Sequence, residues 1–227
     1  MTSRKICAVI PAYNEQGRVS NIVKVLRSLI KYVLVVDDGS TDATAVEAAS
    51  SGAIVLLLPE NMGKKAALEA AAKYIKNFKY VLLFDADLIG LKKKHVYQLI
   101  EPVVSGEVDI SIGLLVGGRF FTHFAQRLAP HLSGQRAMPV SLFIKFLDEY
   151  RTVEGYGIES AMKDFAKRYN LRVAYVDLWG VAQIMKEEKY GFKTGTKLRA
   201  KMYKEILHAI YLGLKSKLVS MFRREDK

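Results

Sequence analysis

The sequence predicts an α/β fold, a three-layer sandwich with a mostly parallel central sheet. Two observations in the first ninety residues predict it: short apolar runs of strand length recur, and segments with helical spacing separate them. The expected strands are apolar on both faces, as buried parallel strands are, and comprise Ile6–Ile10, Val33–Val36, Ile54–Leu58 and Val81–Phe84. The alternating order of strands and helices predicts right-handed crossovers between neighbouring parallel strands.

The helical segments of this half place apolar residues three and four positions apart. Between the first two strands these residues are Val19, Ile22, Val23, Leu26, Leu29 and Ile30. Between the third and fourth strands they are Ala67, Ala70, Ala71, Tyr74 and Ile75. Each segment therefore has one apolar face that can pack on the sheet.

The pattern becomes less regular after residue 90, but elements of both kinds are still expected. In order they are a helix His95–Val104, a strand Asp109–Val116, a helix Phe120–His131, a turn-rich stretch Ser133–Pro139, a helix Leu142–Tyr150, a glycine-rich elbow Gly155–Gly157, a helix Ile158–Tyr169 and a strand Leu171–Val176. A long basic amphipathic helix is expected over Gly195–Phe222. We therefore divide the chain into one domain, residues 1–190, and a C-terminal helical region, residues 191–227.

The net charge of +12 is concentrated at the C-terminal end. Residues 1–60 hold six Lys or Arg and six Asp or Glu, whereas residues 186–227 hold twelve and five, a net of +7. An apolar stripe runs through the same C-terminal region, so we expect it to lie on an anionic membrane surface, with packing on the protein's own sheet or on a second subunit as the alternatives. A uniformly basic nucleic-acid binder is not indicated.

Composition also bears on the compartment. A single cysteine, Cys7, leaves no intrachain disulfide partner, and the N-terminal residues lack the apolar core of a signal peptide. No apolar run reaches the roughly 18 residues that a membrane-spanning helix needs. We expect a cytoplasmic protein, with peripheral association at the inner face of the membrane through the C-terminal region.

Polar residues follow the first three strands, at the sheet edge where ligands of such folds bind. The segment after the first strand is Pro11–Glu15, which is not a glycine-rich phosphate loop, so dinucleotide and P-loop functions lose their main support. The second strand is followed by Asp37–Asp42, whose carboxylates can accept hydrogen bonds from a base or a ribose, although Asp42 is also a good helix N-cap. The third is followed by Asn61–Lys65, which delivers a lysine to a helix N-terminus; this suits a pyrophosphate, but taken alone the segment favours a pair of solvated lysines.

The fourth strand ends in two carboxylates, Asp85 and Asp87, separated only by Ala86. In an extended segment both side chains point the same way, and two like charges that close are costly unless a cation or protons offset them. Mg²⁺ or Mn²⁺ bridging these carboxylates and a diphosphate would offset the charge. The sequence therefore predicts a divalent-metal site at this strand end, with a pair of solvated turn aspartates as the alternative.

Together these residues resemble the family 2 glycosyltransferases of the Rossmann-like GT-A fold. The resemblance rests on Ile10–Glu15, Val35–Asp42, Asn61–Lys64 and Phe84–Asp87, four segments in the order and spacing of the family. Beyond them, Ser133–Arg136 is similar to a stretch of polyprenyl-phosphate sugar transferases, and Gly155–Glu159 is similar to an elbow of glucosyl-3-phosphoglycerate synthases. These two subgroups differ in acceptor and in stereochemistry.

The resemblance implies a nucleotide-sugar half, residues 1–90, and an acceptor half, residues 91–190. It implies that the nucleotide-sugar, with a UDP or GDP carrier, is bound by Pro11, Ala12, Tyr13, Glu15, Asp38, Lys64, Asp85 and Ala86. The implied metal ligands are Asp85, Asp87 and Gln183, and the implied catalytic residues are Asp87 and Glu159. Glu159 would be a general base in an inverting reaction or an acceptor ligand in a retaining one.

The acceptor side is expected to include Arg119, Gly134, Arg136 and Tyr156. A polyprenyl phosphate or another lipid-linked acceptor is the first expectation, and a small phosphorylated soluble acceptor is the alternative. Ile89 stands where many polyprenyl-phosphate transferases have a polar residue, and Gln183 stands where related enzymes often have a histidine. A catalytically weak nucleotide-sugar-binding protein therefore also stays open, as does a homo-oligomer.

Overall fold

The computed structural model describes residues 5–116, 133–150 and 157–184, with side chains in the last range described from Ala161 onward. The strands are β1 (Ile6–Ala12), β2 (Tyr32–Asp37), β3 (Ile54–Leu57), β4 (Tyr80–Leu83), β5 (Leu88–Ile89), β6 (Ile110–Val116), β7 (Arg136–Pro139), β8 (Val173–Trp179) and β9 (Ala182–Gln183). The helices are α1 (Val19–Arg27), α2 (Thr44–Ser50), α3 (Lys64–Ile75), α4 (Lys93–Val104), α6 (Val140–Glu149) and α7 (Gly157–Arg168).

A seven-stranded sheet forms the centre of the described structure, in the order β3-β2-β1-β4-β7-β6-β8. The pairs β3–β2, β2–β1, β1–β4 and β6–β8 are parallel, and β7 alone runs antiparallel, between β4 and β6. β5 and β9 pair separately as a two-stranded antiparallel sheet. The carboxyl ends of β1, β2, β4, β6 and β8 therefore lie at one edge of the main sheet.

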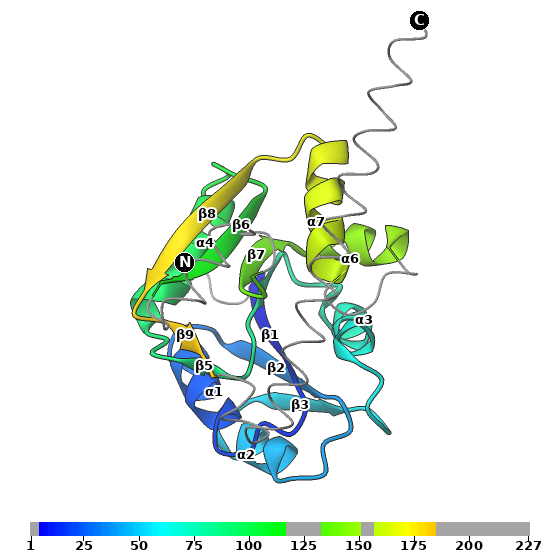
Figure 1. The fold of residues 1–227 in the computed structure, drawn as a ribbon, viewed down its shortest axis with the longest axis vertical. Coiled ribbons are helices and arrows are strands. Elements are labelled where there is room, and N and C mark those ends of the chain that lie inside the picture. Colours follow the sequence, from blue (N-terminus) through cyan, green and yellow to red (C-terminus); the bar gives the residue numbers. More distant parts are fainter. Residues whose placement is uncertain (1–4, 117–132, 151–156, 185–227) are drawn as a thin grey trace, which may run out of the picture.

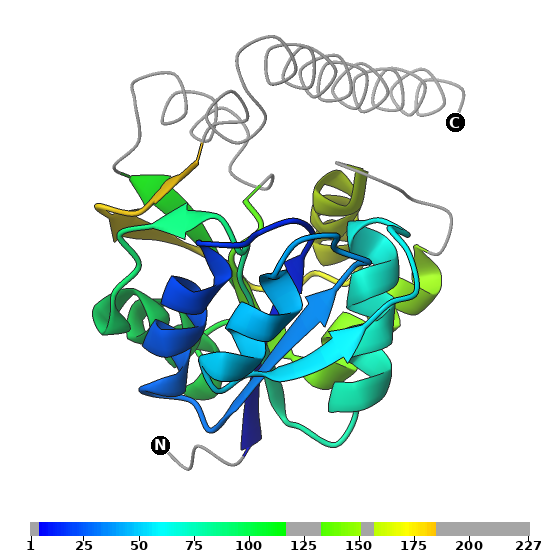
Figure 2. The ribbon, with the colours of Figure 1, turned by 90° about the horizontal axis from the view of Figure 1, so that it is seen from below.

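Helices cover both faces of the sheet, which gives the expected three layers (Figures 1 and 2). Alternate residues of β1 point into two separate hydrophobic cores. Ile10 packs with α1 and α4 on one face of the sheet, and Val9 packs with α3 and α6 on the other. Both side chains are fully buried, as an interior parallel strand requires. The mostly parallel α/β sandwich predicted from the sequence is confirmed.

Two local predictions were wrong. The stretch expected to be turn-rich, Ser133–Pro139, contains the strand β7, which pairs with β4 and β6. Its sequence lacks β-branched residues, so tertiary pairing rather than local preference makes it a strand. The third strand was expected to be buried on both faces, but β3 is an edge strand, and the side chain of Leu57 is 65% exposed.

Part of the chain on which we made predictions lies outside the described residues. This applies to the expected helices at 120–131 and 195–222 and to most of the glycine-rich elbow. Among the described helices, none combines the length and apolar character that crossing a membrane requires.

Candidate active site

Loops that follow β1, β2 and β4 meet at the carboxyl edge of the sheet. The three strands are neighbours, with Ala12 of β1 opposite Asp37 of β2 and Val9 of β1 opposite Leu83 of β4. Because parallel neighbours end at the same edge, segments far apart in the sequence are brought together there. This edge holds most of the residues that the sequence singled out.

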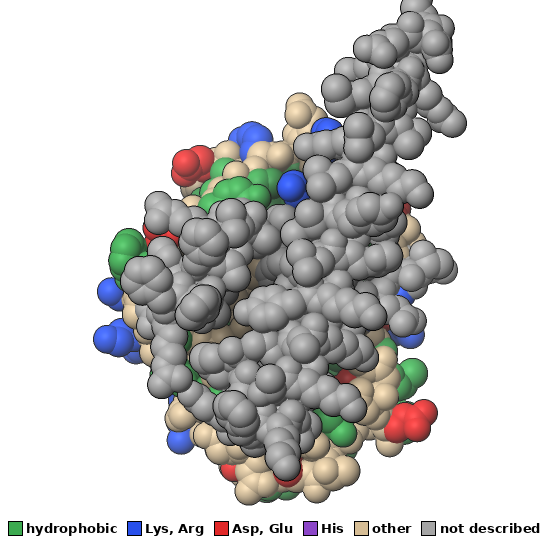
Figure 3. Space-filling view, viewed as in Figure 1, with side chains coloured by type: hydrophobic (Ala, Val, Ile, Leu, Met, Phe, Trp, Pro, Cys, Tyr) green, Lys and Arg blue, Asp and Glu red, His purple; other side chains and the backbone are tan. Residues whose placement is uncertain are grey.

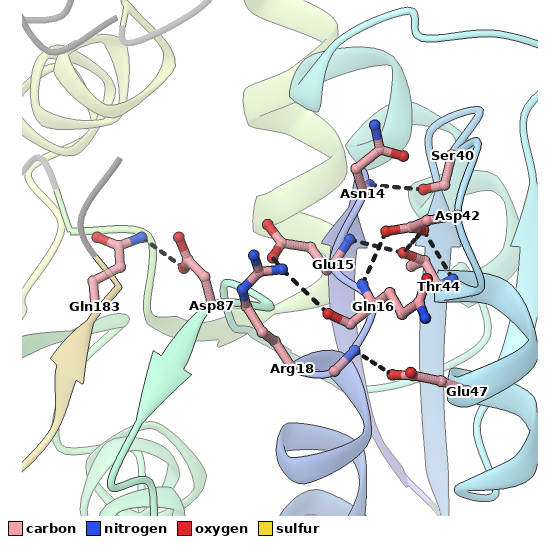
Figure 4. Close-up of polar contacts among 11 residues, drawn as sticks. Asn14, Glu15, Gln16, Arg18, Ser40, Asp42, Thr44, Glu47, Asp87 and Gln183 are labelled. Carbon is pink, nitrogen blue, oxygen red and sulfur yellow. Dashed lines mark hydrogen bonds and ion pairs between the residues drawn. The ribbon is translucent and has the colours of Figure 1, made fainter. Parts of the chain in front are cut away.

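Hydrogen bonds between the loops after β1 and β2 fix the first part of the site (Figure 4). The Asn14 N–H donates to Ser40 Oγ at 2.9 Å, and Asn14 Oδ1 accepts the Thr41 N–H at 2.9 Å. The Glu15 N–H donates to Thr44 Oγ1 at 2.7 Å. Asn14 has a φ of 52°, a conformation that asparagine tolerates better than most residues. The same kind of bond joins Gln16 to Asp42 and Gly17 to Glu47.

Asp38 connects the loop after β2 to the loop that precedes α3. Its two carboxylate oxygens accept the backbone N–H groups of Met62 and Gly63 at 2.9 and 2.8 Å, and the residue is buried. Gly39 has a φ of +71°, and a Cβ at this position would overlap the Glu60 backbone. Asp38 therefore fixes the segment that carries Lys64.

The carboxylate of Asp85 is held from three directions. Lys64 Nζ donates to Oδ1 at 3.1 Å, and Oδ2 accepts Gln135 Nε2 at 2.8 Å and Gln183 Nε2 at 3.3 Å. These donors come from α3, from the segment before β7 and from β9. Only 17% of the Asp85 side chain is exposed, so its orientation is set by protein groups more than by water.

The same neighbours determine the ionisation of Asp85. Burial by itself raises the pKa of this carboxyl, but the charge and hydrogen bond of Lys64, the Gln135 amide and the charge of Arg136 together lower the pKa below its ordinary value. Asp85 is therefore an anion at neutral pH. At this strand end the Asp85 carboxylate can attract a cation, and the neighbouring Lys64 ammonium can attract an anion.

Asp87 and Gln183 face each other across the small β5–β9 sheet. Gln183 Nε2 donates to Asp87 Oδ1 at 2.9 Å (Figure 4). The same Nε2 also donates to Asp85 Oδ2 at 3.3 Å, so one amide touches both carboxylates. The pairing of Leu88 with Gln183 and the hydrogen bond from the Ile184 N–H to the Asp87 carbonyl at 3.1 Å hold the two segments together. The three residues expected to bind a metal thus lie in one cluster.

Gly134 and Arg136 complete the edge of the site near Asp85. A Cβ on Gly134 would overlap the Asp85 carboxylate, so only glycine fits beside it. Arg136 is buried in β7, and its Nε donates to the Ser133 carbonyl at 3.1 Å. Both residues line a small cavity of about 20 Å³, together with Pro11, Lys64 and Asp85.

The remaining predicted site residues have different positions. Ala12 and Ala86 are buried, and Tyr13 is half-buried in the loop after β1. The Glu15 carboxylate lies 3.5 Å from the Arg18 guanidinium, at the start of α1. Arg119 and Tyr156 lie outside the described residues. Glu159 belongs to the first turn of α7, and its side chain is outside the described part of the structure.

One residue that touches the predicted site, Gln135, was missed from the sequence. Its side chain is buried, with Nε2 on Asp85 and Oε1 accepting the Ser133 hydroxyl at 2.8 Å. Gln135 lies inside the Ser133–Arg136 segment on which the resemblance partly rests. That segment has the pattern Ser-Gly-x-Arg, and Gln135 occupies the position x, where any residue is allowed. Burial of an amide in a segment expected to be a turn could not be read from the sequence.

Comparison with known proteins identifies the family. The model described as "Glycosyl transferase family 2" matches residues 7–174, well over half of the chain. The chain belongs to glycosyl transferase family 2. The match includes all four strand-end segments on which the resemblance rested, and the GT-A fold follows from it.

Two glycosyltransferases are similar to part of this chain. Glycosyltransferase AglJ of Haloferax volcanii is 30% identical over 188 residues, which cover 74% of this chain and 60% of AglJ. A dolichyl-phosphate beta-glucosyltransferase of Trichomonas vaginalis is 35% identical over 112 residues, covering 41% of this chain and 32% of that protein. The chain thus spans less than two thirds of the length of these relatives.

A solved structure shows the same architecture. Glucosyl-3-phosphoglycerate synthase of Mycobacterium tuberculosis, in complex with Mn²⁺, uridine-diphosphate-glucose and phosphoglyceric acid, has a TM-score of 0.65 to this chain at 26% identity. The match covers 80% of this chain and 72% of the synthase chain. The ligands bound in that synthase therefore provide a comparison for the site of this chain.

Proposed function

We propose that this protein transfers a sugar from a nucleotide-sugar, with UDP as the first carrier to test, to an acceptor that carries a phosphate. The observation that carries this proposal is the cluster at the ends of β4 and β9, where Lys64, Gln135 and Gln183 surround the carboxylates of Asp85 and Asp87. A lysine beside clustered carboxylates at a parallel sheet edge fits a diphosphate with a divalent cation. The complex of the mycobacterial synthase with Mn²⁺ and UDP-glucose supports the same assignment.

The described residues fit Mg²⁺ or Mn²⁺ held jointly by protein and substrate. Among them no group of three or more His, Cys, Asp or Glu side chains could enclose a metal, but Asp85, Asp87 and the amide of Gln183 lie together. Cations of this kind commonly use one or two carboxylates and take further oxygens from phosphates and water. When bound, the cation would neutralise charge on the departing nucleoside diphosphate.

The protein's own residues divide into three roles under this proposal. Pro11, Ala12, Tyr13 and Asp38 border the space for the nucleoside, and Lys64 approaches the diphosphate with its ammonium group. Asp85 and Asp87 provide the negative charge that a cation needs. Glu159, in the first turn of α7, is the proposed acidic group on the acceptor side, as a general base or as an acceptor ligand.

A phosphorylated acceptor is supported by chemistry that the relatives' acceptors share. One relative is a dolichyl-phosphate beta-glucosyltransferase, and the synthase complex contains phosphoglyceric acid. In this chain Arg136 and Lys64 line the small cavity beside Asp85, so both add positive charge near the site.

The rim of the site favours a lipid-linked form of this acceptor. Ile89 and Trp179 are 52% and 63% exposed where β5 and β8 end, and Gly90 packs tightly against Gly180 between them. The exposed lysines 92–94 follow directly. Figure 3 shows hydrophobic and Lys or Arg side chains along the left edge of the molecule, near the end of β8. Exposed apolar and basic groups together fit an anionic lipid surface.

Calorimetric titration of UDP-glucose in Mn²⁺ and then in EDTA tests the donor side. We expect binding that depends on the metal, because without a cation the diphosphate would meet the carboxylates of Asp85 and Asp87. We also expect Asp87→Ala to abolish binding and turnover, because it removes a proposed ligand of that cation. Asp164→Ala removes an exposed carboxylate on α7 and is the matched control. Equal affinity in Mn²⁺ and EDTA would contradict the metal assignment.

Transfer assays then separate the acceptors. A polyprenyl phosphate in vesicles with anionic lipid, 3-phosphoglycerate, and a polyprenyl alcohol without phosphate are offered with labelled UDP-glucose. We expect product with the polyprenyl phosphate and none with the alcohol. Product with 3-phosphoglycerate alone identifies a soluble acceptor, and tight donor binding without any product indicates a nucleotide-sugar-binding protein.

A further inference from the structure

The buried amide of Gln135 connects the β6–β7 part of the sheet to Asp85. Gln135 Nε2 donates to Asp85 Oδ2 at 2.8 Å, and Gln135 Oε1 accepts the Ser133 hydroxyl at 2.8 Å. The side chain is only 1% exposed. The backbone is fixed as well, because the Gly113 N–H donates to the Gln135 carbonyl at 2.9 Å. Both ends of the amide therefore have protein partners.

The orientation of this amide follows from its partners. Asp85 Oδ2 accepts the N–H groups of two amides, and a glutamine oxygen placed there would instead face a carboxylate oxygen. The N–H end must therefore point to Asp85, and the oxygen must point to Ser133. Gly113 makes room for this arrangement, since a Cβ there would lie 3.3 Å from the Gln135 Cβ and 2.6 Å from a Leu178 methyl.

The position of the amide determines which Asp85 oxygen is left for other partners. Gln135 and Gln183 both donate to Oδ2, whereas Oδ1 faces Lys64. Gly134, directly before Gln135, lets the backbone pass close to the carboxylate. We propose that Gln135 is a positioning residue for the glycosyl transfer: by holding Oδ2, it sets the direction of the Asp85 carboxylate toward Lys64 and the metal–diphosphate group.

The choice of a neutral amide is consistent with this role. A lysine or arginine at position 135 would neutralise Asp85 and compete with a cation, and a glutamate would repel the carboxylate. A glutamine orients the anion and leaves its charge in place. Groups that orient metal-binding side chains in this way typically affect metal affinity or activity about 10- to 100-fold when they are removed.

Gln135→Met tests the proposal, because methionine has a similar volume and cannot donate a hydrogen bond. We measure Mn²⁺ binding in the presence of UDP from the electron paramagnetic resonance signal of free Mn²⁺, and the melting temperature on the same sample. We expect Mn²⁺ affinity to fall about 10-fold or more in Gln135→Met. Gln98→Met, a change of the same kind at an exposed position of α4, should leave the affinity unchanged.

Two further variants keep the test decisive if Gln135→Met lowers the melting temperature. Ser133→Ala removes the hydroxyl that contacts both Gln135 Oε1 and the Gly113 carbonyl, and it takes no hydrogen-bond partner from Asp85. We expect a smaller loss of Mn²⁺ affinity in the same direction. Gln183→Met combined with Gln135→Met completes a double-mutant cycle, in which the two effects should not add because both amides serve the same oxygen. A purely structural role for Gln135 predicts additive losses.

The proposal rests on the proposed function, and the wild-type protein separates the two. If wild-type protein binds no Mn²⁺ with UDP, both the metal assignment and the role of Gln135 fail. If wild-type protein binds Mn²⁺ and the Gln135→Met and Ser133→Ala variants bind it equally well, only the role of Gln135 is overturned. Additive effects in the cycle with Gln183 overturn it too.

Discussion

The two sides of the site are built by different means. On the proposed nucleoside side, the loops after β1 and β2 are joined through backbone N–H groups, as in the pairs Asn14–Ser40 and Glu15–Thr44. On the proposed diphosphate side, side chains hold other side chains, as Gln135 and Gln183 hold Asp85. The partners are 26 and 29 residues apart in the first case and 50 and 98 in the second.

This difference suggests a division between stability and activity. Backbone N–H groups that lose a buried partner destabilise the folded state, because the unfolded chain satisfies them with water. The side chains that hold Asp85 instead fix the direction of a carboxylate at the proposed ligand site, so they serve a ligand more than the fold. Substitutions on the nucleoside side should therefore lower stability first, and those on the diphosphate side should lower activity first.

Asp38→Ala should produce the largest loss of stability. The substitution leaves the Met62 and Gly63 N–H groups without their acceptor, and we expect the free energy of unfolding to fall by about 3 kcal/mol. Urea unfolding measures this change, and Glu60→Ala in the neighbouring exposed loop position is the control. A loss no larger than that of Glu60→Ala would break the proposed division, since the buried carboxylate would then contribute nothing to the fold.

Gly134→Ala examines the diphosphate side with a change of one methyl group. The new Cβ would overlap Asp85 Oδ2, so the carboxylate must turn away from its present direction or the backbone before β7 must move. We expect kcat to fall about 10-fold, while overpacking lowers the free energy of unfolding by about 1 kcal/mol. Steady-state kinetics and urea unfolding on the same preparation measure both quantities.

The stability and kcat of Gly134→Ala are compared with those of Asp38→Ala. If Gly134→Ala loses stability as Asp38→Ala does but keeps kcat, the direction of the Asp85 carboxylate is unimportant for turnover, and the two sides do not differ in the way proposed.

The first half of the chain could be predicted from the sequence because its signals are local. A strand such as Val33–Val36 shows its burial in its own composition, and Asp85 and Asp87 follow their strand directly. The prediction failed where partners decide the outcome. β7 is a strand because β4 and β6 flank it, and Gln135 is part of the site because its amide reaches Asp85.

The sequence also did not show which strand lies at the edge of the sheet. The run Ile54–Leu57 is as apolar as an interior strand, yet Leu57 is exposed, because no strand pairs beyond β3 in the described sheet. Which strand ends a sheet depends on the whole topology, and hydrophobic content alone does not determine it. Gln183 illustrates the reverse case: it was singled out by comparison with a family pattern, and the pairing of β9 with β5 places it beside Asp87.

The smallest effect that we predict concerns His95, which lies in α4 outside both sides of the site. Burial lowers the pKa of its imidazole below the ordinary 6.5, Lys94 and Lys92 lower it further, and the nearby Trp179 backbone acts in the opposite direction. The folded protein therefore binds this proton more weakly than the unfolded chain does. The resulting stabilisation is fully present above the ordinary pKa and is lost as the pH falls through the lower, folded-state pKa.

His95→Gln removes this titration, and the Gln oxygen can still accept the Lys92 N–H that His95 Nδ1 now accepts at 3.0 Å. Urea unfolding at about pH 7.5 and about pH 5 should show a smaller loss of stability on acidification in the variant than in the wild type. Carboxylates also titrate in acid, but they are common to both proteins, so the difference isolates the histidine. An equal loss in both proteins would mean that the pH dependence arises from the carboxylates, Asp85 and its neighbours included, and that the start of α4 plays no part in it.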